Sequence, residues 1–144
     1  MKTEHNLNLW RNTKEVISWF EGSKKNTKHS FTTFDVCDFY PSISEDLLDK
    51  ALSFASRHAN ISAQDIEIIK HSKKTYLYHN NTPWVKQHSP FDVTMGSFDG
   101  AETCELVGLF LLSKIAHLKI DCGLYRDDGL ALCELTPRQT EQTK

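Results

Sequence analysis

Two segments about ninety residues apart each place aspartates where a short apolar run ends, and this pairing constrains the fold more than any other feature. The first segment spans Phe34 to Tyr40 (FDVCDFY), and the second spans Leu124 to Gly129 (LYRDDG). Burying a carboxylate is costly unless a positive group binds it. The fold must therefore bring both segments to an accessible edge, and two carboxylate sources that meet there suit two-metal phosphoryl transfer.

The composition is that of one globular domain with little net charge. The chain has 144 residues, is 39% apolar and 25% charged, and carries a formal charge of −2, which excludes a disordered polypeptide. A free-standing nucleic-acid binder is usually more basic, so affinity for nucleic acid should come largely from segments outside this chain. Without a signal peptide we expect an intracellular protein in either nucleus or cytoplasm. The longest apolar run, 106–112, is too short to span a bilayer, and we expect no membrane contact.

The predicted elements alternate between helices and strands, which indicates an α/β (α+β) domain. Ser44 is placed to cap one helix, and Ser62 with Asp65 resembles a capping box for the next. Thr13 is expected to cap an N-terminal helix with Val16, Ile17 and Phe20 on its apolar face, and residues 101–118 form a strongly apolar helix. A strand is expected at 31–38, and hairpins at 75–87 and 124–135, the second with its acids at the tip.

Three segments are expected along the chain. Residues 1–30 form an N-terminal helix and a polar loop, and residues 31–135 form the unit that carries the acidic motifs. Residues 136–144 begin a further segment, because Thr136-Pro137 opens a helix that has little length to continue.

The acidic motifs predict a cation site. On a strand Asp35 faces away from its neighbours, and it meets Asp127 if the two strands are adjacent. Two unit charges 4 Å apart repel by about 4 kcal/mol at an effective dielectric of 20, so a shared proton or a bound cation is needed. Oxygen ligands with room for phosphate and water suit Mg²⁺. The plainer alternative is that these are ordinary turn acids, since Asp-Asp-Gly is common turn chemistry.

Three motifs in order resemble those of reverse transcriptases. The segment from Phe34 to Ile43 (FDVCDFYPSI) resembles their first catalytic motif, and Tyr125 to Asp128 (YRDD) resembles their Tyr-x-Asp-Asp motif. Between them, Met95-Gly96-Ser97 and the following helix resemble the motif that supports template and incoming nucleotide. The similarity is to Penelope-like retroelement reverse transcriptases in particular, and it covers roughly residues 12–135.

The resemblance implies a polymerase palm, in which a small antiparallel sheet has helices packed on one face. It implies RNA-directed DNA polymerase activity with two Mg²⁺ ions, or Mn²⁺, held by Asp35 and Asp127, with Asp128 as a supporting acid. It places the nucleotide near Val36, Cys37, Asp38, Phe39, Tyr40, Gly96 and Ser97, with Tyr40 as the steric gate against a ribose 2′-hydroxyl. Tyr125 and Arg126 would lie near the primer. The implied partners are template with primer, deoxynucleoside triphosphates, and fingers and thumb segments without which we expect the chain alone to be inactive.

The chain departs from the family at 98–102 (FDGAE), where relatives commonly have proline. Asp99 and Glu102 are expected to cap the following helix there. Two alternatives stay open: a domesticated palm that only binds, and the palm of a protein-primed DNA-directed DNA polymerase. The second family tends to separate the two later acids by one residue. Tyr76, Tyr78, Trp84 and Lys86 are expected to be half-buried hairpin residues, with a base-stacking surface as the alternative.

Overall fold

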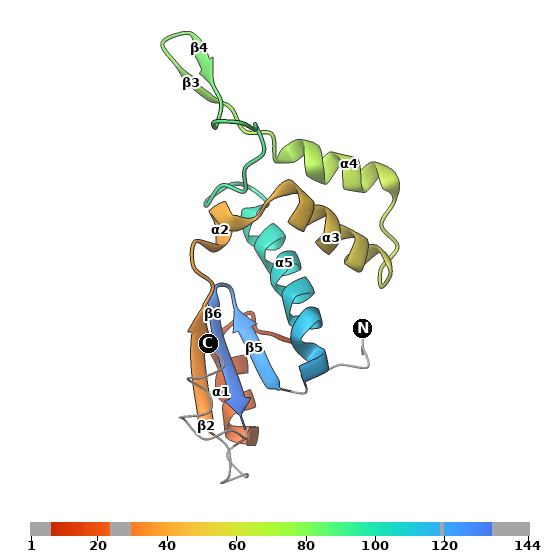
Figure 1. Cartoon of the computed structure of the whole chain (residues 1–144), viewed down its shortest axis with the longest axis vertical. Coiled ribbons are helices and arrows are strands. Elements are labelled where there is room, and N and C mark those ends of the chain that lie inside the picture. The colour runs from red at the N-terminus through yellow and green to blue at the C-terminus, as the bar shows by residue number, and fades with distance from the viewer. Residues whose placement is uncertain (1–6, 24–29, 119, 134–144) are drawn as a thin grey trace. The chain divides into compact units, whose positions relative to one another are not determined.

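The computed structural model describes residues 7–23, 30–118 and 120–133, and it confirms the α+β class (Figure 1). The segment predicted at 136–144 lies outside the described residues. In chain order the elements are β1 (Asn8–Leu9), α1 (Thr13–Ser23), β2 (Ser30–Asp35), α2 (Phe39–Ser42), α3 (Glu45–Ser56), α4 (Ala63–Ser72), β3 (Leu77–His79), β4 (Thr82–Trp84), α5 (Gly100–Ile115), a 3₁₀ turn (Ala116–Leu118), β5 (Asp121–Tyr125) and β6 (Asp128–Cys133).

Contacts divide the chain into two compact units. The sheet unit contains Met1–Cys37 and Leu111–Lys144, and the helical unit contains Asp38–Phe110. The predicted palm segment 31–135 therefore contributes to both units. The residues of the first catalytic motif are divided between them after Cys37.

The sheet unit is built on a four-stranded sheet in the order β1-β5-β6-β2. β6 is central and pairs antiparallel with both β5 and β2. The short β1 runs parallel to β5, so the sheet is mixed and not purely antiparallel as expected. The two motif-bearing strands, β2 and β6, are direct neighbours.

One face of this sheet packs against the end of α5. Cys122, Leu124 and Ala131 are buried there with Leu112 of α5, and Ile115 and Val36 pack at the margin. The register places these strand residues on the same face, because side chains alternate along each strand. This apolar contact forms the core of the sheet unit.

The opposite face carries α1, so the expectation that helices cover only one face is wrong. Trp19 of α1 contacts Phe31 edge-on, with ring centroids 6.4 Å apart, and its Nε1 donates to Asp121 Oδ1 at 3.1 Å. The ring of Trp10 occupies the space above Gly123, where a Cβ would lie 2.5 Å from it. Aromatic residues from the N-terminal segment therefore cover part of this second face.

The start of α1 also differs from the prediction. Asn12, not Thr13, caps the helix: its Oδ1 accepts the Glu15 N–H at 3.1 Å, while the Glu15 carboxylate accepts the Arg11 N–H at 2.8 Å. Ile17, expected on the apolar face, is 50% exposed. The helix instead contacts the sheet through Trp19 and the predicted Phe20, whose ring centroids lie 6.4 Å and 4.6 Å from that of Phe31.

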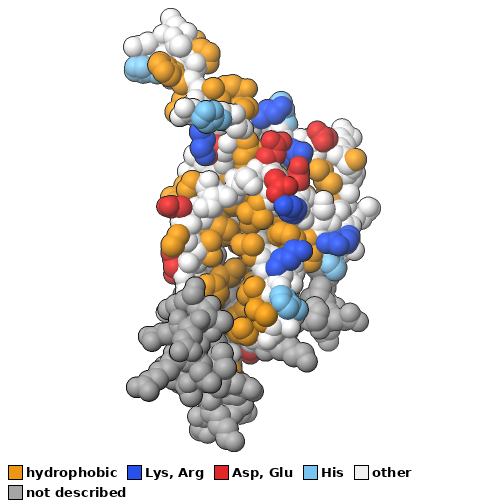
Figure 2. Space-filling model, in the orientation of Figure 1, with side chains coloured by type: hydrophobic (Ala, Val, Ile, Leu, Met, Phe, Trp, Pro, Cys, Tyr) orange, Lys and Arg blue, Asp and Glu red, His pale blue; other side chains and the backbone are white. Residues whose placement is uncertain are grey.

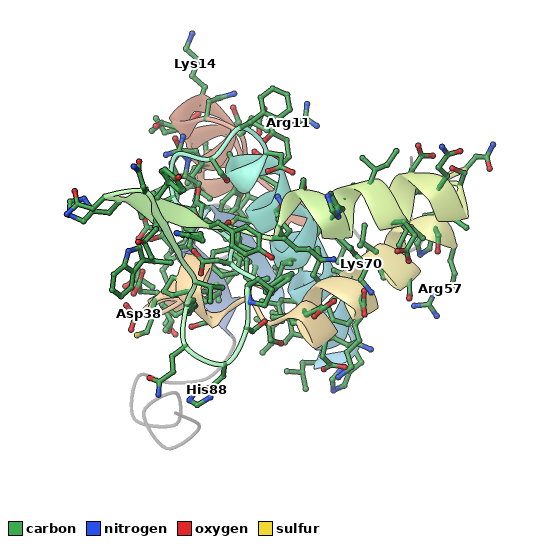
Figure 3. All side chains as sticks on the ribbon, turned by 90° about the horizontal axis from the view of Figure 1, so that it is seen from above. Arg11, Lys14, Asp38, Arg57, Lys70 and His88 are labelled. Carbon is green, nitrogen blue, oxygen red and sulfur yellow. The ribbon has the colours of Figure 1, made fainter. Side chains whose placement is uncertain are left out.

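In the helical unit the predicted caps are confirmed. Ser44 Oγ accepts the Leu47 N–H at 3.2 Å and starts α3, whose residues Leu48, Ala51 and Leu52 are fully buried. Ser62 and Asp65 form both bonds of a capping box at the start of α4. Figure 3 shows Lys70 of α4, whose Nζ lies 3.0 Å from an Asp49 oxygen on α3.

The hairpin β3–β4 reverses at Asn80 and Asn81, as predicted. Both residues have positive φ, 47° and 58°, which is the geometry of a type I′ turn. The strands are shorter than expected. The aromatic side chains are not half-buried: Tyr76, Tyr78 and Trp84 are 61%, 72% and 58% exposed.

Candidate active site

Asp35 and Asp128 are direct partners across the β2–β6 ladder. The adjacent pair, Val36 and Asp127, is hydrogen-bonded through Val36 N–H and the Asp127 carbonyl at 2.9 Å. Hydrogen-bonded and non-hydrogen-bonded pairs alternate, so Asp35 and Asp128 form a non-hydrogen-bonded pair with Cα atoms about 4.5 Å apart. Both side chains extend from the same face and are exposed.

The β5–β6 turn consists of Arg126 and Asp127, with Tyr125 and Asp128 paired on either side. Arg126 has a φ of 57° and Asp127 has no positive φ, which matches a type II′ turn. The prediction of an Asp127-Asp128-Gly129 tip is therefore wrong. Asp127 lies in the turn, and Asp128 begins β6. Asp127 therefore directly precedes the Asp35–Asp128 pair in the chain.

Gly129 is held in the strand by the ring of Phe34. A Cβ at Gly129 would lie 2.2 Å from that ring, which fills the space above the glycine. Phe34 and Gly129 are partners in register. Gly129 was expected in a turn, but it is needed because the Phe34 ring lies where a side chain would be. Sequence reasoning did not identify Phe34 and Gly129 as neighbours of the Asp35–Asp128 pair.

The remaining motif residues of the sheet unit have distinct places. Val36 is partly buried and packs against the core on the α5 side. Cys37 is exposed in the bend after β2. The Arg126 guanidinium lies 5.7 Å from the centre of the Tyr125 ring, within cation–π range. Both residues adjoin Asp127 at the predicted primer side.

In the helical unit, the end of the first motif forms the single-turn helix α2. The strand predicted at 31–38 ends earlier in the structure, at Asp35. Asp38 adopts a left-handed conformation, φ 49° and ψ 42°, just before α2 (Figure 3). The Asp38 carbonyl accepts the Ser42 N–H at 2.9 Å, and the Asp38 side chain makes no cap bond. Phe39 is buried in the core of this unit, whereas Tyr40 is half-buried.

Tyr40 lies beside the Met-Gly-Ser loop. A Cβ built on Gly100 would lie 2.7 Å from Ser97 Oγ, 2.8 Å from the Thr94 carbonyl oxygen and 3.5 Å from the Tyr40 ring. Gly96 has a φ of 84°, which a side chain disfavours. The structure thus brings together Tyr40, Ser97 and Gly100, and sequence reasoning missed Gly100, whose place at a helix start was its only signal.

The negative charge of the Asp99 carboxylate beside this loop is neutralised by an ion pair, which the sequence did not indicate. The Asp99 carbonyl accepts the Thr103 N–H at 3.0 Å in the first turn of α5, while its side chain pairs with Lys73, Nζ to Oδ1 2.5 Å. Burial alone would raise the pKa of Asp99, but Lys73 and the Ser72 hydroxyl outweigh it and hold that pKa below 3.8. Lys73 is 1% exposed, and sequence reasoning missed it because the two residues are far apart in the chain.

The predicted site residues therefore form two groups, one in each unit. Asp35, Asp127 and Asp128 lie at one end of the sheet, where Asp35 is opposite Asp128 and Asp127 is opposite Val36. Tyr40, Gly96 and Ser97 lie near the start of α5. Within the described ranges no three His, Cys, Asp or Glu side chains are arranged to hold a metal ion. Asp35 and Asp128 are both exposed, so their carboxylates are accessible to a cation from solvent.

Comparison with known proteins yields no assignment: no family model matches the chain, and no curated protein gives a significant match. In the part of the chain that the structure describes, no helix combines the length and apolarity that a bilayer crossing needs.

Proposed function

We propose that this chain is a polymerase palm that transfers nucleotides to a primer 3′-hydroxyl, as reverse transcriptases do. The observation that carries the proposal is the pairing of Asp35 with Asp128 across neighbouring strands, with Asp127 in the adjoining turn. Those two strands carry the two motifs that resemble the catalytic motifs of that family.

The carboxylates give the site its chemistry. Like charges directly opposite on a sheet face are destabilising, so the pair favours a cation between its members. Mg²⁺ suits these oxygen ligands, and two such ions would activate the 3′-hydroxyl and stabilise the leaving pyrophosphate. Asp35 and Asp127 would be the main ligands, and Asp128 would contribute from the strand beside them.

The resemblance assigns nucleotide contacts to Tyr40, Gly96 and Ser97, which all belong to the helical unit. Gly96 leaves its backbone open to a close approach, and the Tyr40 ring would exclude a ribose 2′-hydroxyl. Ser97 Oγ adds a hydrogen-bonding group to the same loop. The Lys73–Asp99 pair supports the proposal, because it neutralises a carboxylate that would otherwise repel a triphosphate.

Metal binding tests the carboxylate site directly. Mn²⁺ binding, followed by the loss of the free-ion EPR signal, should weaken at least about tenfold in Asp35→Asn and in Asp128→Asn, since each loses one charged ligand. Asp46→Asn removes an exposed carboxylate, 74% exposed, from α3 and is the matched control. Equal Mn²⁺ affinity in all four proteins would overturn the site.

Primer extension tests the reaction. The assay uses the chain joined to fingers and thumb segments, because we expect the chain alone to be inactive. That longer protein should extend a labelled primer on RNA and on DNA templates with deoxynucleotides and Mg²⁺ or Mn²⁺, and its Asp127→Asn variant should not. Extension that survives this substitution would exclude the proposed ligand role. Mn²⁺ binding at the acids, with no extension on either template by the protein that includes fingers and thumb, would favour the binding-only alternative.

A further inference from the structure

The hairpin β3–β4 presents aromatic side chains on both of its faces. In register, Leu77 pairs with Trp84 and Tyr78 pairs with Pro83, so Trp84 lies on one face and Tyr78 on the other. Tyr76, Tyr78 and Trp84 are all more than half exposed. Figure 2 shows hydrophobic side chains and histidine gathered along this hairpin.

The Trp84 face also lines a hollow. A cavity of about 420 Å³ is lined by Leu77, Trp84, Lys86 and Asp92, among others. Its volume falls in the range of small-ligand pockets, which is large enough for a nucleobase. Lys86 Nζ lies 2.9 Å from Asp92 Oδ1, so the only acid that lines the cavity is paired with a lysine.

The charge around the hairpin differs from that of the whole chain. Residues 74–91 contain Lys74, Lys86, His79 and His88 and no aspartate or glutamate, in a chain with 19 acids and 17 lysines and arginines. Lys74 is exposed, and no carboxylate of the described residues lies within ion-pair distance of it. Lys86 is paired with Asp92, so Lys74 is the free positive charge beside the exposed aromatic rings, a combination that complements a polyanion with flat apolar groups.

We propose that the β3–β4 hairpin binds single-stranded nucleic acid, with bases stacked on Trp84 and Tyr78 and phosphates near Lys74. Every base offers a face for stacking, so such a surface tolerates different sequences and accepts RNA and DNA alike. The turn at Asn80 and Asn81 is polar, which disfavours insertion of the hairpin into a lipid bilayer. This site is separate from the proposed nucleotidyl transfer and needs neither metal nor nucleotide.

The first test measures binding of fluorescein-labelled dT12 and rU12 by anisotropy, in EDTA and about 50 mM salt. Tyr78→Leu and Trp84→Leu keep an apolar side chain but remove the ring, and each should weaken binding about 5-fold to 100-fold. Tyr78→Phe and Trp84→Phe should retain most of the affinity. Ile68→Ala removes an apolar side chain that is 59% exposed on α4 and should have no effect.

A second test uses salt. Lys74→Ala should reduce the slope of log affinity against log salt by about 0.7, the value for one phosphate contact on a single strand. Lys50→Ala, a lysine 60% exposed on α3, is the matched control and should leave the slope unchanged. Comparison of dT12 with rU12 shows whether the site prefers DNA or RNA.

Several results would overturn the proposal. One is the absence of binding to both oligonucleotides, and another is equal affinity of the leucine and phenylalanine variants, which would indicate a nonspecific apolar surface. A concentration-dependent dimer that Trp84→Leu abolishes would assign the hairpin to contact between copies of the chain. Binding to anionic vesicles without binding to either oligonucleotide would assign it to lipid.

Discussion

At Gly129 the missing side chain makes room for the ring of Phe34, and this contact places Asp128 opposite Asp35. The ring occupies the space of the absent Cβ, and the turn forms earlier, at Arg126 and Asp127. A non-glycine residue with positive φ, such as Arg126, costs about 1 kcal/mol or more. The hairpin accepts this cost because moving the turn would shift the register of β6 and expose its core face.

Gly129→Ala should therefore lower the free energy of unfolding by about 1 kcal/mol, because the added methyl displaces the Phe34 ring. Urea unfolding followed by circular dichroism measures the change. In a Phe34→Ala background the same substitution should become stabilising, since the obstacle is gone and alanine restricts the unfolded chain. Gly22→Ala is the control, with no atom within 4 Å of the new methyl. Equal destabilisation in both backgrounds would contradict the role of Phe34.

At the scale of elements, Lys73 and Asp99 join the end of α4 to the start of α5. Lys73 Nζ is buried and has no partner of hydrogen-bonding geometry among the described residues, so its charge depends on the ion pair with the Asp99 carboxylate. The backbone reinforces the link, because the Lys73 carbonyl accepts the Asp92 N–H at 2.9 Å. The loop with Gly96 and Ser97 lies between these anchored positions.

Stability should fall in acid because of this pair. The pKa of Asp99 is lower in the folded state than its ordinary value of 3.8, so the stabilisation is complete above that value. It is lost as the pH falls from about 4 through the lower folded-state pKa, where Asp99 takes up a proton. Thermal unfolding at pH 7 and at pH 2 to 4 measures this loss.

Asp99→Asn should remove that acid-dependent component and cost about 3 kcal/mol at pH 7, because the Lys73 ammonium stays buried without its counter-charge. Adding Lys73→Met should recover much of the loss, since an apolar chain of similar length suits the site. Asp46→Asn, on the exposed surface of α3, is the control for a neutralised carboxylate. An unchanged acid limb in Asp99→Asn would show that other groups cause the acid sensitivity.

At the scale of the whole molecule, the two units differ in how their strands are supported. β6 pairs on both sides and packs against α5, whereas β3 and β4 pair only with each other and all their residues are exposed. A lone two-stranded hairpin is marginally stable in water. Local opening should therefore be easiest at β3–β4.

Hydrogen exchange followed by mass spectrometry should show this contrast. Peptides that cover β6 and the buried part of α3 should exchange slowly, and the peptide that covers residues 77–84 should exchange fastest among the sheet segments. If dT12 or rU12 binds the hairpin, the same peptide should gain protection while β6 does not change. Slow exchange at 77–84 without a ligand would contradict the exposed hairpin.

Local interactions were predictable from the sequence. The Ser44 cap, the Ser62–Asp65 capping box and the Asn80-Asn81 turn each depend on residues at most three positions apart, so the chain encodes them directly. The motifs placed acids on two segments, and Asp35 was expected to meet Asp127 if their strands were neighbours. The strands are neighbours, but the predicted partner is wrong, because the register pairs Asp35 with Asp128 and places Asp127 opposite Val36.

Only the tertiary structure decided how distant residues meet. It set the register that pairs Asp35 with Asp128, the contact of Phe34 with Gly129, and the burial of Lys73 beside Asp99. It also left the hairpin aromatics exposed. Periodicity along the chain cannot determine such features, because they depend on which surfaces pack across long sequence separations and which remain in water.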